Sequence, residues 1–349
     1  MLKRLTGRVL ARAKRSFPRQ LPNAKEIEIR HLPARYERRS NDFTVNVWGY
    51  RGTQTRELRY CLNGSAYSVV DAEPPRVGRN TFVIEIPPEA CRKGTNELTL
   101  EVVDNRSKVH HIERSFEYDP EPPELPLLSD WRSDLDSADG FWETVDRDGT
   151  LWVRPIPGLE AYDRVIVAAP AFPGGRRVTA TILFRGRLQD KPFSFGLLPL
   201  WGGRPDRDGH APRRGWCFAI ANYYSGHGGV GMEFSYRDSS AKPAWVGVYR
   251  GLDIEPGQSF KIVVEAWPEA SPEGNHYCFQ QRARWSRVGG ETGPWMQLSD
   301  IQGAPLPYRE YGVAVIAHQC QIECGPVRIE PIVTPHPMRA ATADFSRNE

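Results

Sequence analysis

Polar and aromatic side chains that could hold a ligand are concentrated between residues 199 and 250. Aromatic faces cover the C–H surface of a sugar, while charged groups and amides form forked hydrogen bonds to its hydroxyls. This stretch supplies both kinds of group, and it therefore favours carbohydrate binding. The candidate ligand-binding residues are Trp201, Arg204, Asp206, Asp208, Arg214, Asn222, Tyr223, His227 and Trp245.

Two glutamates and a histidine raise the alternative of catalysis. In VGMEFSYRD (230–238), Glu233 alternates with an apolar row, and Glu265 belongs to a mixed face of residues 259–267. Carboxylates on neighbouring strands can act as acid and nucleophile or base in glycoside cleavage, with His210 as a further candidate. The opposing interpretation is that both glutamates are solvated residues of an outer face, which is common in β-sandwiches.

Metal and thiol chemistry receive little support. Asp206, Asp208 and His210 lie in a loop without strand pattern, but Ca²⁺ needs more oxygen ligands than this loop offers. We expect no cofactor, with Ca²⁺ as the alternative. None of the six cysteines forms a C-x-x-C pair, and Cys320 and Cys324 would lie about 13 Å apart on one strand, so free, mostly buried thiols are predicted.

The elements that must position these side chains are β-strands. Residues 131–335 contain about eleven strand patterns, such as GWCFAIANYY (215–224), without a convincing helix, which predicts a two-sheet sandwich. Residues 25–120 form a smaller β domain with a hairpin signal at Asn63-Gly64. The proline-rich residues 121–130 are interpreted as a linker, and residues 336–349 as a tail.

Two family resemblances refine this organisation. Trp131, the strand LWV (151–153), Tyr162-Asp163 and the closing GVAVIAHQCQIECGPVRI (312–329) resemble the concanavalin-A-like, laminin-G-like jelly roll of glycan-binding and glycan-cleaving proteins. Residues 94–119 resemble the last two strands of immunoglobulin-like and fibronectin-III-like modules. The resemblances imply an all-β chain in which an immunoglobulin-like β-sandwich precedes a concanavalin-A-like jelly roll.

Enzymatic signatures of related jelly rolls are missing. The E-x-D-x-x-E pattern of β-glucanases is absent. Arg56-Glu57-Leu58-Arg59 resembles a strand of jelly-roll alginate lyases, but it falls in the small domain and its companion segments are lacking, so we interpret it as coincidence. These absences favour binding a glycan over cutting it.

Charge is distributed unevenly along the chain. Residues 1–20 carry seven cations and no acid, so the overall charge of +3 leaves −4 for residues 21–349 and argues against a nucleic-acid partner. Residues 1–24 are interpreted as a frayed basic tail, an amphipathic helix in peripheral membrane contact, or a transit peptide. Without a signal-peptide core, a cytoplasmic or membrane-peripheral location is favoured, with an extracellular one as alternative.

Three functions remain open from the sequence. The first is a non-catalytic protein that binds a glycan or polysaccharide through a jelly-roll groove lined with aromatics. The second is a glycoside hydrolase or polysaccharide lyase that uses Glu233 with a second acid or histidine. The third is a structural or protein-interaction sandwich.

Overall fold

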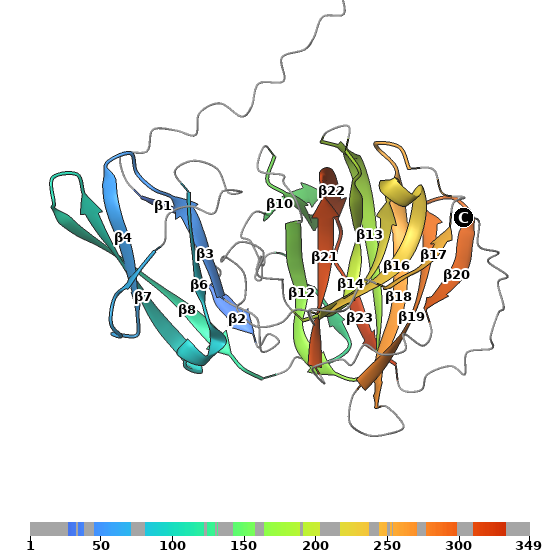
Figure 1. Ribbon diagram of the computed structural model, residues 1–349, viewed down its shortest axis with the longest axis horizontal. Coiled ribbons are helices and arrows are strands. Elements are labelled where there is room, and N and C mark those ends of the chain that lie inside the picture. The colour runs from blue at the N-terminus through green and yellow to red at the C-terminus, as the bar shows by residue number, and fades with distance from the viewer. Residues whose placement is uncertain are drawn as a thin grey trace, which may run out of the picture.

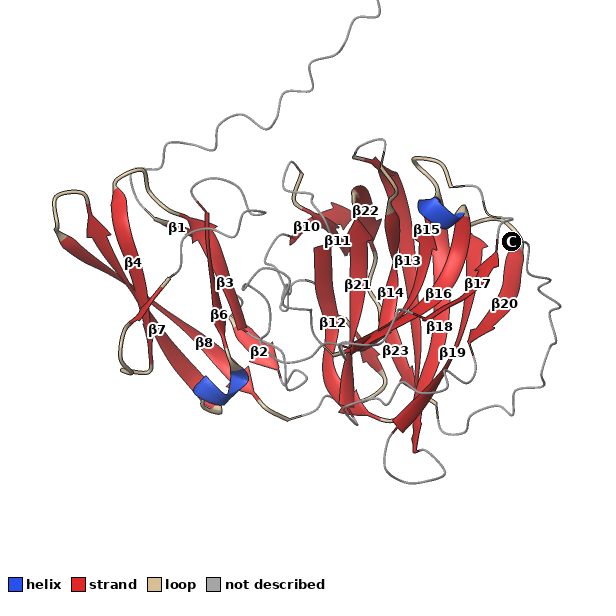
Figure 2. Ribbon diagram, viewed as in Figure 1, coloured by secondary structure: helices blue, strands red, loops and turns tan. Residues whose placement is uncertain are grey.

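The computed structural model places most of the strand-forming chain. It describes residues 27–32, 34–37, 45–70, 81–121, 124–129, 131, 142–157, 164–188, 191–202, 217–236, 244–249, 252, 254–270, 277–298 and 310–332. These residues are almost entirely β-strand and turn, with two short 3-10 segments as the helical elements (Figure 2). Among them, no helix is long and apolar enough to cross a membrane. Residues 1–24 and 336–349, on which we based the leader and tail, lie outside the described residues.

The N-terminal sandwich has a three-stranded sheet of order β1-β3-β6 and a five-stranded sheet of order β2-β8-β7-β4-β5 (Figure 1). Alternate residues of facing strands, including Val47, Leu58 and Phe82, are fully buried between the two sheets. Its elements are β1 (Glu28–His31), β2 (Arg35–Glu37), β3 (Val45–Tyr50), β4 (Thr55–Leu62), β5 (Ser68–Val69), β6 (Thr81–Ile86), η1 (Pro88–Ala90), β7 (Gly94–Asp104) and β8 (Val109–Asp119).

The C-terminal part is a larger two-sheet sandwich. One sheet has nine strands in the order β10-β11-β22-β13-β18-β19-β20, with β23 beside β13 and β9 beside β23. The other has six, in the order β12-β21-β14-β15-β16-β17. The elements are β9 (Leu127–Leu128), β10 (Trp142–Arg147), β11 (Thr150–Pro155), β12 (Arg164–Pro173), β13 (Arg176–Arg187), β14 (Ser194–Trp201), β15 (Cys217–Tyr224), η2 (Ser225–His227), β16 (Gly229–Tyr236), β17 (Ala244–Tyr249), β18 (Ser259–Ala270), β19 (Tyr277–Arg287), β20 (Thr292–Leu298), β21 (Glu310–His318), β22 (Cys320–Cys324) and β23 (Arg328–Pro331).

Strand alternation separates the core from the surface of the nine-stranded sheet. In β18, Phe260, Ile262 and Val264 are fully buried against the six-stranded sheet, and each contributes about 1.5–3 kcal/mol through burial. The intervening Lys261 is exposed, so this sheet has an outer face of mixed composition. The predicted all-β, jelly-roll sandwich is confirmed.

Two details refine the sequence predictions. Leu127–Leu128, within the predicted linker, form β9 and pair with β23, so these two residues belong to the large sandwich. Cys61, Cys91, Cys320 and Cys324 are free, as expected, and burial raises the pKa of Cys91 to about 12. The side chains of the other two cysteines lie outside the described part.

Candidate functional site

A pocket of about 460 Å³ opens on the outer face of the nine-stranded sheet, near the end of the β10–β11 hairpin. Its volume lies in the range of small-molecule sites, roughly 300–1,000 Å³. One aromatic ring, three hydroxyl groups, a carboxylate and a guanidinium line it. They belong to Trp152, Thr150, Thr181, Ser259, Asp148 and Arg147, with Leu183, Gly325 and Pro326 completing the wall.

A two-residue turn sets the backbone geometry at the end of the β10–β11 hairpin. Arg147 pairs with Thr150 across the turn, and the two residues between them have positive φ angles, 52° at Asp148 and 78° at Gly149. Such a turn requires left-handed backbone at both positions, for which Asp-Gly is a preferred sequence. The carboxylate of Asp146 accepts a hydrogen bond from the Gly149 amide at 3.0 Å and fixes the turn further.

An ion-pair cluster fastens the hairpin to the sheet. The carboxylate of Glu323, on β22, is nearly buried and is bound by the guanidinium groups of Arg147 and Arg185, the latter at 2.7 Å. Next to it, the backbone of Val153 pairs with Cys324, which joins β11 to β22. A charge pair at low exposure is held in one geometry, so the hairpin end has a defined position beside β22.

The indole of Trp152 lies directly against backbone. A Cβ atom at Gly325 would lie 3.3 Å from two atoms of the ring, so the glycine permits this close approach. The Gly325 amide donates to the carbonyl of Thr181 at 2.9 Å, and its carbonyl accepts a hydrogen bond from the Trp131 indole at 3.2 Å. The ring is therefore seated on a backbone segment that is itself fixed.

The three hydroxyls come from separate strands. Thr181 lies on β13 and Ser259 on β18, at outward positions of the sheet, while Thr150 is an exposed residue at the start of β11. Hydroxyls are both donors and acceptors, and an indole covers apolar C–H groups. The pocket can thus contact both the polar edge and the apolar face of a small polyhydroxylated ligand.

Three of the predicted binding residues that lie on the six-stranded sheet have described side chains, and these do not form one open site. Trp201 is 2% exposed and Asn222 3%, in or beside an apolar cluster on the sheet's outer side that includes Ile220. Among the described residues, the Oδ1 atom of Asn222 has no hydrogen-bond partner. Tyr223 instead points between the sheets, where its ring lies 5.6 Å from that of Phe193. Tyr223 and Asn222 thus lie on opposite faces of the strand, because successive residues of a strand face opposite ways, and their role in binding stays a prediction.

The two candidate glutamates lie on different sheets. Glu233 belongs to β16 of the six-stranded sheet and Glu265 to β18 of the nine-stranded sheet, so the prediction of neighbouring strands is wrong. Glu265 is 2% exposed and binds Arg177 at 2.6 Å as well as Arg282. Burial raises its pKa, but hydrogen bonds and attraction from Arg282 and Arg177 outweigh this and hold the pKa below its usual value. Glu265 is thus an ionised structural anchor.

The other predicted residues are placed by backbone only or lie outside the described residues. The register puts Glu233 opposite Ile220 on one side and Trp245 on the other. The side chains of Glu233, Trp245 and His227 lie outside the described part of the structure. The described residues contain no group of three or more potential metal ligands. Predicted residues outside the described ranges are Arg204, Asp206, Asp208, His210 and Arg214.

Sequence reasoning missed the pocket around Trp152. Asp148-Gly149 followed by a Thr-Leu-Trp-Val strand was a local signal for a hairpin with an aromatic residue near its end. The proximity of Thr181, Ser259 and Gly325 carried no such signal, because these residues are brought together by pairings of strands far apart in the chain.

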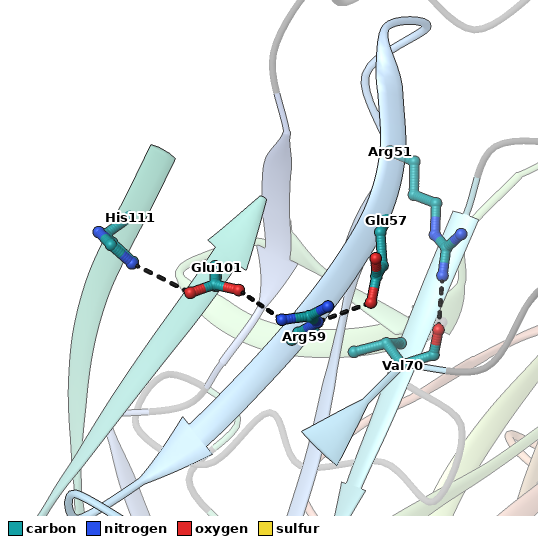
Figure 3. Close-up of polar contacts among 6 residues, drawn as sticks. All are labelled: Arg51, Glu57, Arg59, Val70, Glu101 and His111. Carbon is teal, nitrogen blue, oxygen red and sulfur yellow. Dashed lines mark hydrogen bonds and ion pairs between the residues drawn. The ribbon is translucent and has the colours of Figure 1, made fainter. Parts of the chain in front are cut away.

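A second polar cluster lies on the N-terminal sandwich (Figure 3). Arg59 binds Glu57 at 2.6 Å and Glu101 at 3.2 Å, and a ring nitrogen of His111 lies 3.4 Å from Glu101. Arg51 separately donates to the carbonyl of Val70 at 2.8 Å. The alignment of Arg59, Glu101 and His111 follows the register of β4, β7 and β8. These charges satisfy one another on a partly exposed sheet, which is typical of a surface network.

The whole chain has low similarity to known proteins. No protein-family model and no curated protein matches it. Among solved structures, a Bacillus subtilis carbohydrate-binding module is 12% identical (55% of this chain, 92% of that one, TM-score 0.28). A Lotus tetragonolobus seed lectin is 9% identical (56% and 94%, TM-score 0.34), and a Mycobacterium marinum beta-1,3-glucanase is 15% identical (60% and 87%, TM-score 0.30). Likeness at this level assigns no function to the chain.

Proposed function

We propose that this protein binds a carbohydrate in the pocket around Trp152. The observation that carries the proposal is the convergence of one seated indole with three hydroxyls and the Asp148 carboxylate in about 460 Å³. Sugars present C–H faces and hydroxyl edges together, and this pocket is complementary to both. The rigid backbone beneath the ring reduces the entropy lost on binding.

The composition of the pocket favours binding over cleavage. Glycosidases commonly use two carboxyl groups about 5–10 Å apart on either side of the scissile bond. The described lining of this pocket has one, Asp148, and the nearby carboxylate of Glu323 is already bound by two arginines. A single free acid is sufficient to accept hydrogen bonds from sugar hydroxyls but does not make a catalytic pair.

We further propose that the N-terminal sandwich is an immunoglobulin-like module acting as a spacer or interaction surface. The order β1-β3-β6 in one sheet, with β4, β7 and β8 adjacent in the other, corresponds to the A-B-E and C-F-G arrangement of such domains. Its described polar cluster consists of charges that already pair with one another.

A glycan array, run with a reducing-end release assay, tests the proposed function. We expect the full chain to bind a subset of glycans. Trp152→Ala should weaken that binding about tenfold or more, because the indole surface that contacts the sugar is lost. Tyr67→Ala is the matched control, since Tyr67 is an exposed aromatic residue (43%) on the other sandwich. Its variant should bind as the unchanged protein does.

Two results would count against this assignment. If no glycan binds on the array and no reducing ends are released, the carbohydrate-binding proposal is wrong and the protein-interaction alternative remains. Release of reducing ends that is abolished by Glu233→Gln but not by Trp152→Ala would place a hydrolytic function on the six-stranded sheet instead. Thermal unfolding of each variant distinguishes loss of the site from loss of the fold.

A further inference from the structure

The outer face of the nine-stranded sheet continues from the pocket across β18, β19 and β20 (Figure 1). Thr181, which lines the pocket, pairs directly with Lys261. One step further along these strands, Val263 pairs with Arg284, and Arg284 pairs with Trp295. A ligand that leaves the pocket along this face therefore meets a lysine, an arginine and a second tryptophan.

This face has an excess of positive charge. Eight cations and six carboxylates occupy the outward positions of its described strands and the hairpin end, which leaves two positive charges in a body whose residues 21–349 sum to −4. Each buried carboxylate is shared by two arginines and so neutralises half of their charge. The cations are Arg147, Arg154, Arg177, Arg185, Lys261, Arg282, Arg284 and Arg328, and the carboxylates are Glu143, Asp148, Glu265, Glu269, Glu323 and Glu330.

Two of these cations are available to a ligand. Lys261 is exposed, and within the part of the chain that the structure describes neither it nor Arg284 has a carboxylate partner. Glu265, the acid closest to them in register, is already bound by Arg177 and Arg282. Lys261 is therefore a solvated ammonium and Arg284 a guanidinium whose donors are free to bind an anionic group.

Trp295 supplies a second aromatic surface beside this charge. It is 39% exposed, and the guanidinium carbons of Arg282 and Arg284 each lie 4.7 Å from the centre of one of its rings. The stacking holds both arginines in place at the surface. An aromatic face flanked by guanidinium groups is suited to a sugar ring that carries a negative substituent.

We propose that this face binds an acidic polysaccharide, whose chain runs from the Trp152 pocket across the strands to Trp295. Lys261 and Arg284 pair with its carboxylate, sulfate or phosphate groups. Five strand steps separate β11 from β20, roughly 24 Å, which accommodates several sugar units. The inference rests on the proposed function, since Trp152 anchors one end of the same ligand, and it adds the charge and length of that ligand.

The test compares charged and neutralised forms of the same oligosaccharides. The full chain is titrated with oligogalacturonate and chondroitin sulfate oligosaccharides, with their carboxyl-reduced and desulfated counterparts, and with a 20-base-pair DNA duplex. The variants are Lys261→Ala/Arg284→Ala and Trp152→Ala, with Lys108→Ala as control. Lys108 is an exposed lysine in the β7–β8 turn of the other sandwich.

We expect at least one acidic oligosaccharide to bind, and its neutral counterpart to bind about tenfold more weakly or worse. Binding should weaken by about tenfold or more in the Lys261/Arg284 double variant and between 0.1 and 1 M salt, because salt screens these exposed charges. Trp152→Ala should weaken binding of both forms. Lys108→Ala should leave every affinity unchanged.

The other possible results contradict the inference. They also show whether the proposed function fails with it. If neutral forms bind as tightly as acidic ones, or only neutral glycans bind, and Trp152→Ala alone weakens them, carbohydrate binding stands and the preference for acidic chains is wrong. If no oligosaccharide binds, both proposals are wrong. Equal or tighter binding of the DNA duplex, lost in the Lys261/Arg284 double variant, would make the face a nucleic-acid surface.

Discussion

Several charged side chains of this protein fix the position of the backbone or of other charged side chains. Arg176 is fully buried and donates to the carbonyls of Tyr311, Phe172 and Gly174, at 2.5, 3.0 and 2.6 Å. Its guanidinium carbon also lies 4.0 Å from the centre of the Phe172 ring. One side chain therefore ties together the ends of β12 and β21 and the turn that leads into β13.

The shape of the guanidinium matters at this position. We expect Arg176→Lys to lower the free energy of unfolding by about 3 kcal/mol, because an ammonium cannot reach three separate carbonyls and leaves buried acceptors unsatisfied. Urea denaturation measures the loss. The adjacent Arg177→Lys is the matched control, since that side chain is 46% exposed and a lysine there can still pair with Glu265, so the loss should be about 1 kcal/mol or less. Equal losses in both variants would contradict the role of Arg176.

Residue type alone did not reveal which acids the fold anchors. Glu265 has the sequence context of a solvated outer-face acid, as one interpretation held, yet it is 2% exposed. Arg282 and Arg177, from the strands on either side of β18, cover it. Which strand lies beside β18 is a long-range property, so no local pattern distinguishes an anchored acid from a catalytic one.

At the scale of elements, turns were more predictable than pairings. The Asn63-Gly64 turn is confirmed, with φ angles of 53° and 75° where β4 turns back. The Asp148-Gly149 turn carries the same chemistry and directs Trp152 and Thr150 into the pocket. The two turns therefore provide a comparison in which one backbone change affects the proposed site and the other does not.

We expect Gly149→Val to destabilise the C-terminal sandwich by about 1–2 kcal/mol, because a β-branched residue is strained at a φ of 78°. The same change should weaken glycan binding, since the hairpin end shifts. Gly64→Val, at a φ of 75° and with equal space around it, should destabilise the N-terminal sandwich similarly without affecting binding. Denaturation and titration of both variants measure this. Equal loss of binding in the Gly149→Val and Gly64→Val variants would show that the geometry of the β10–β11 hairpin does not determine binding.

On the scale of the whole molecule, composition and strand spacing predicted two all-β units. They could not predict which sheet face carries the pocket. That face is made by β13 pairing with β18, more than seventy residues later, and with β22, more than a hundred and thirty residues later. A one-residue slip of β18 against β13 would put Ser259 and Thr181 on opposite faces of the sheet. Register depends on packing of the entire core, which a local sequence window does not contain.

The two sandwiches have separate hydrophobic cores with no residue in common. Each core can therefore be lost on its own, so denaturation of the full chain should show two transitions. A buried histidine near the end of β1 distinguishes them. His31 is 6% exposed and pairs in register with the buried Trp48, and burial lowers its pKa from 6.5 to about 3.

Acid should therefore weaken the N-terminal transition first. Between pH 6.5 and 3 the unfolded chain binds a proton that folded His31 excludes, so stability is complete above pH 6.5 and falls as pH decreases. From pH 7 to pH 5, above most carboxylate titration, we expect a loss of about 2 kcal/mol in that transition alone. Urea denaturation at each pH, followed by tryptophan fluorescence, measures it. His31→Leu should remove most of this pH dependence. A pH-independent N-terminal transition in the unchanged protein would show that His31 gains its proton without unfolding.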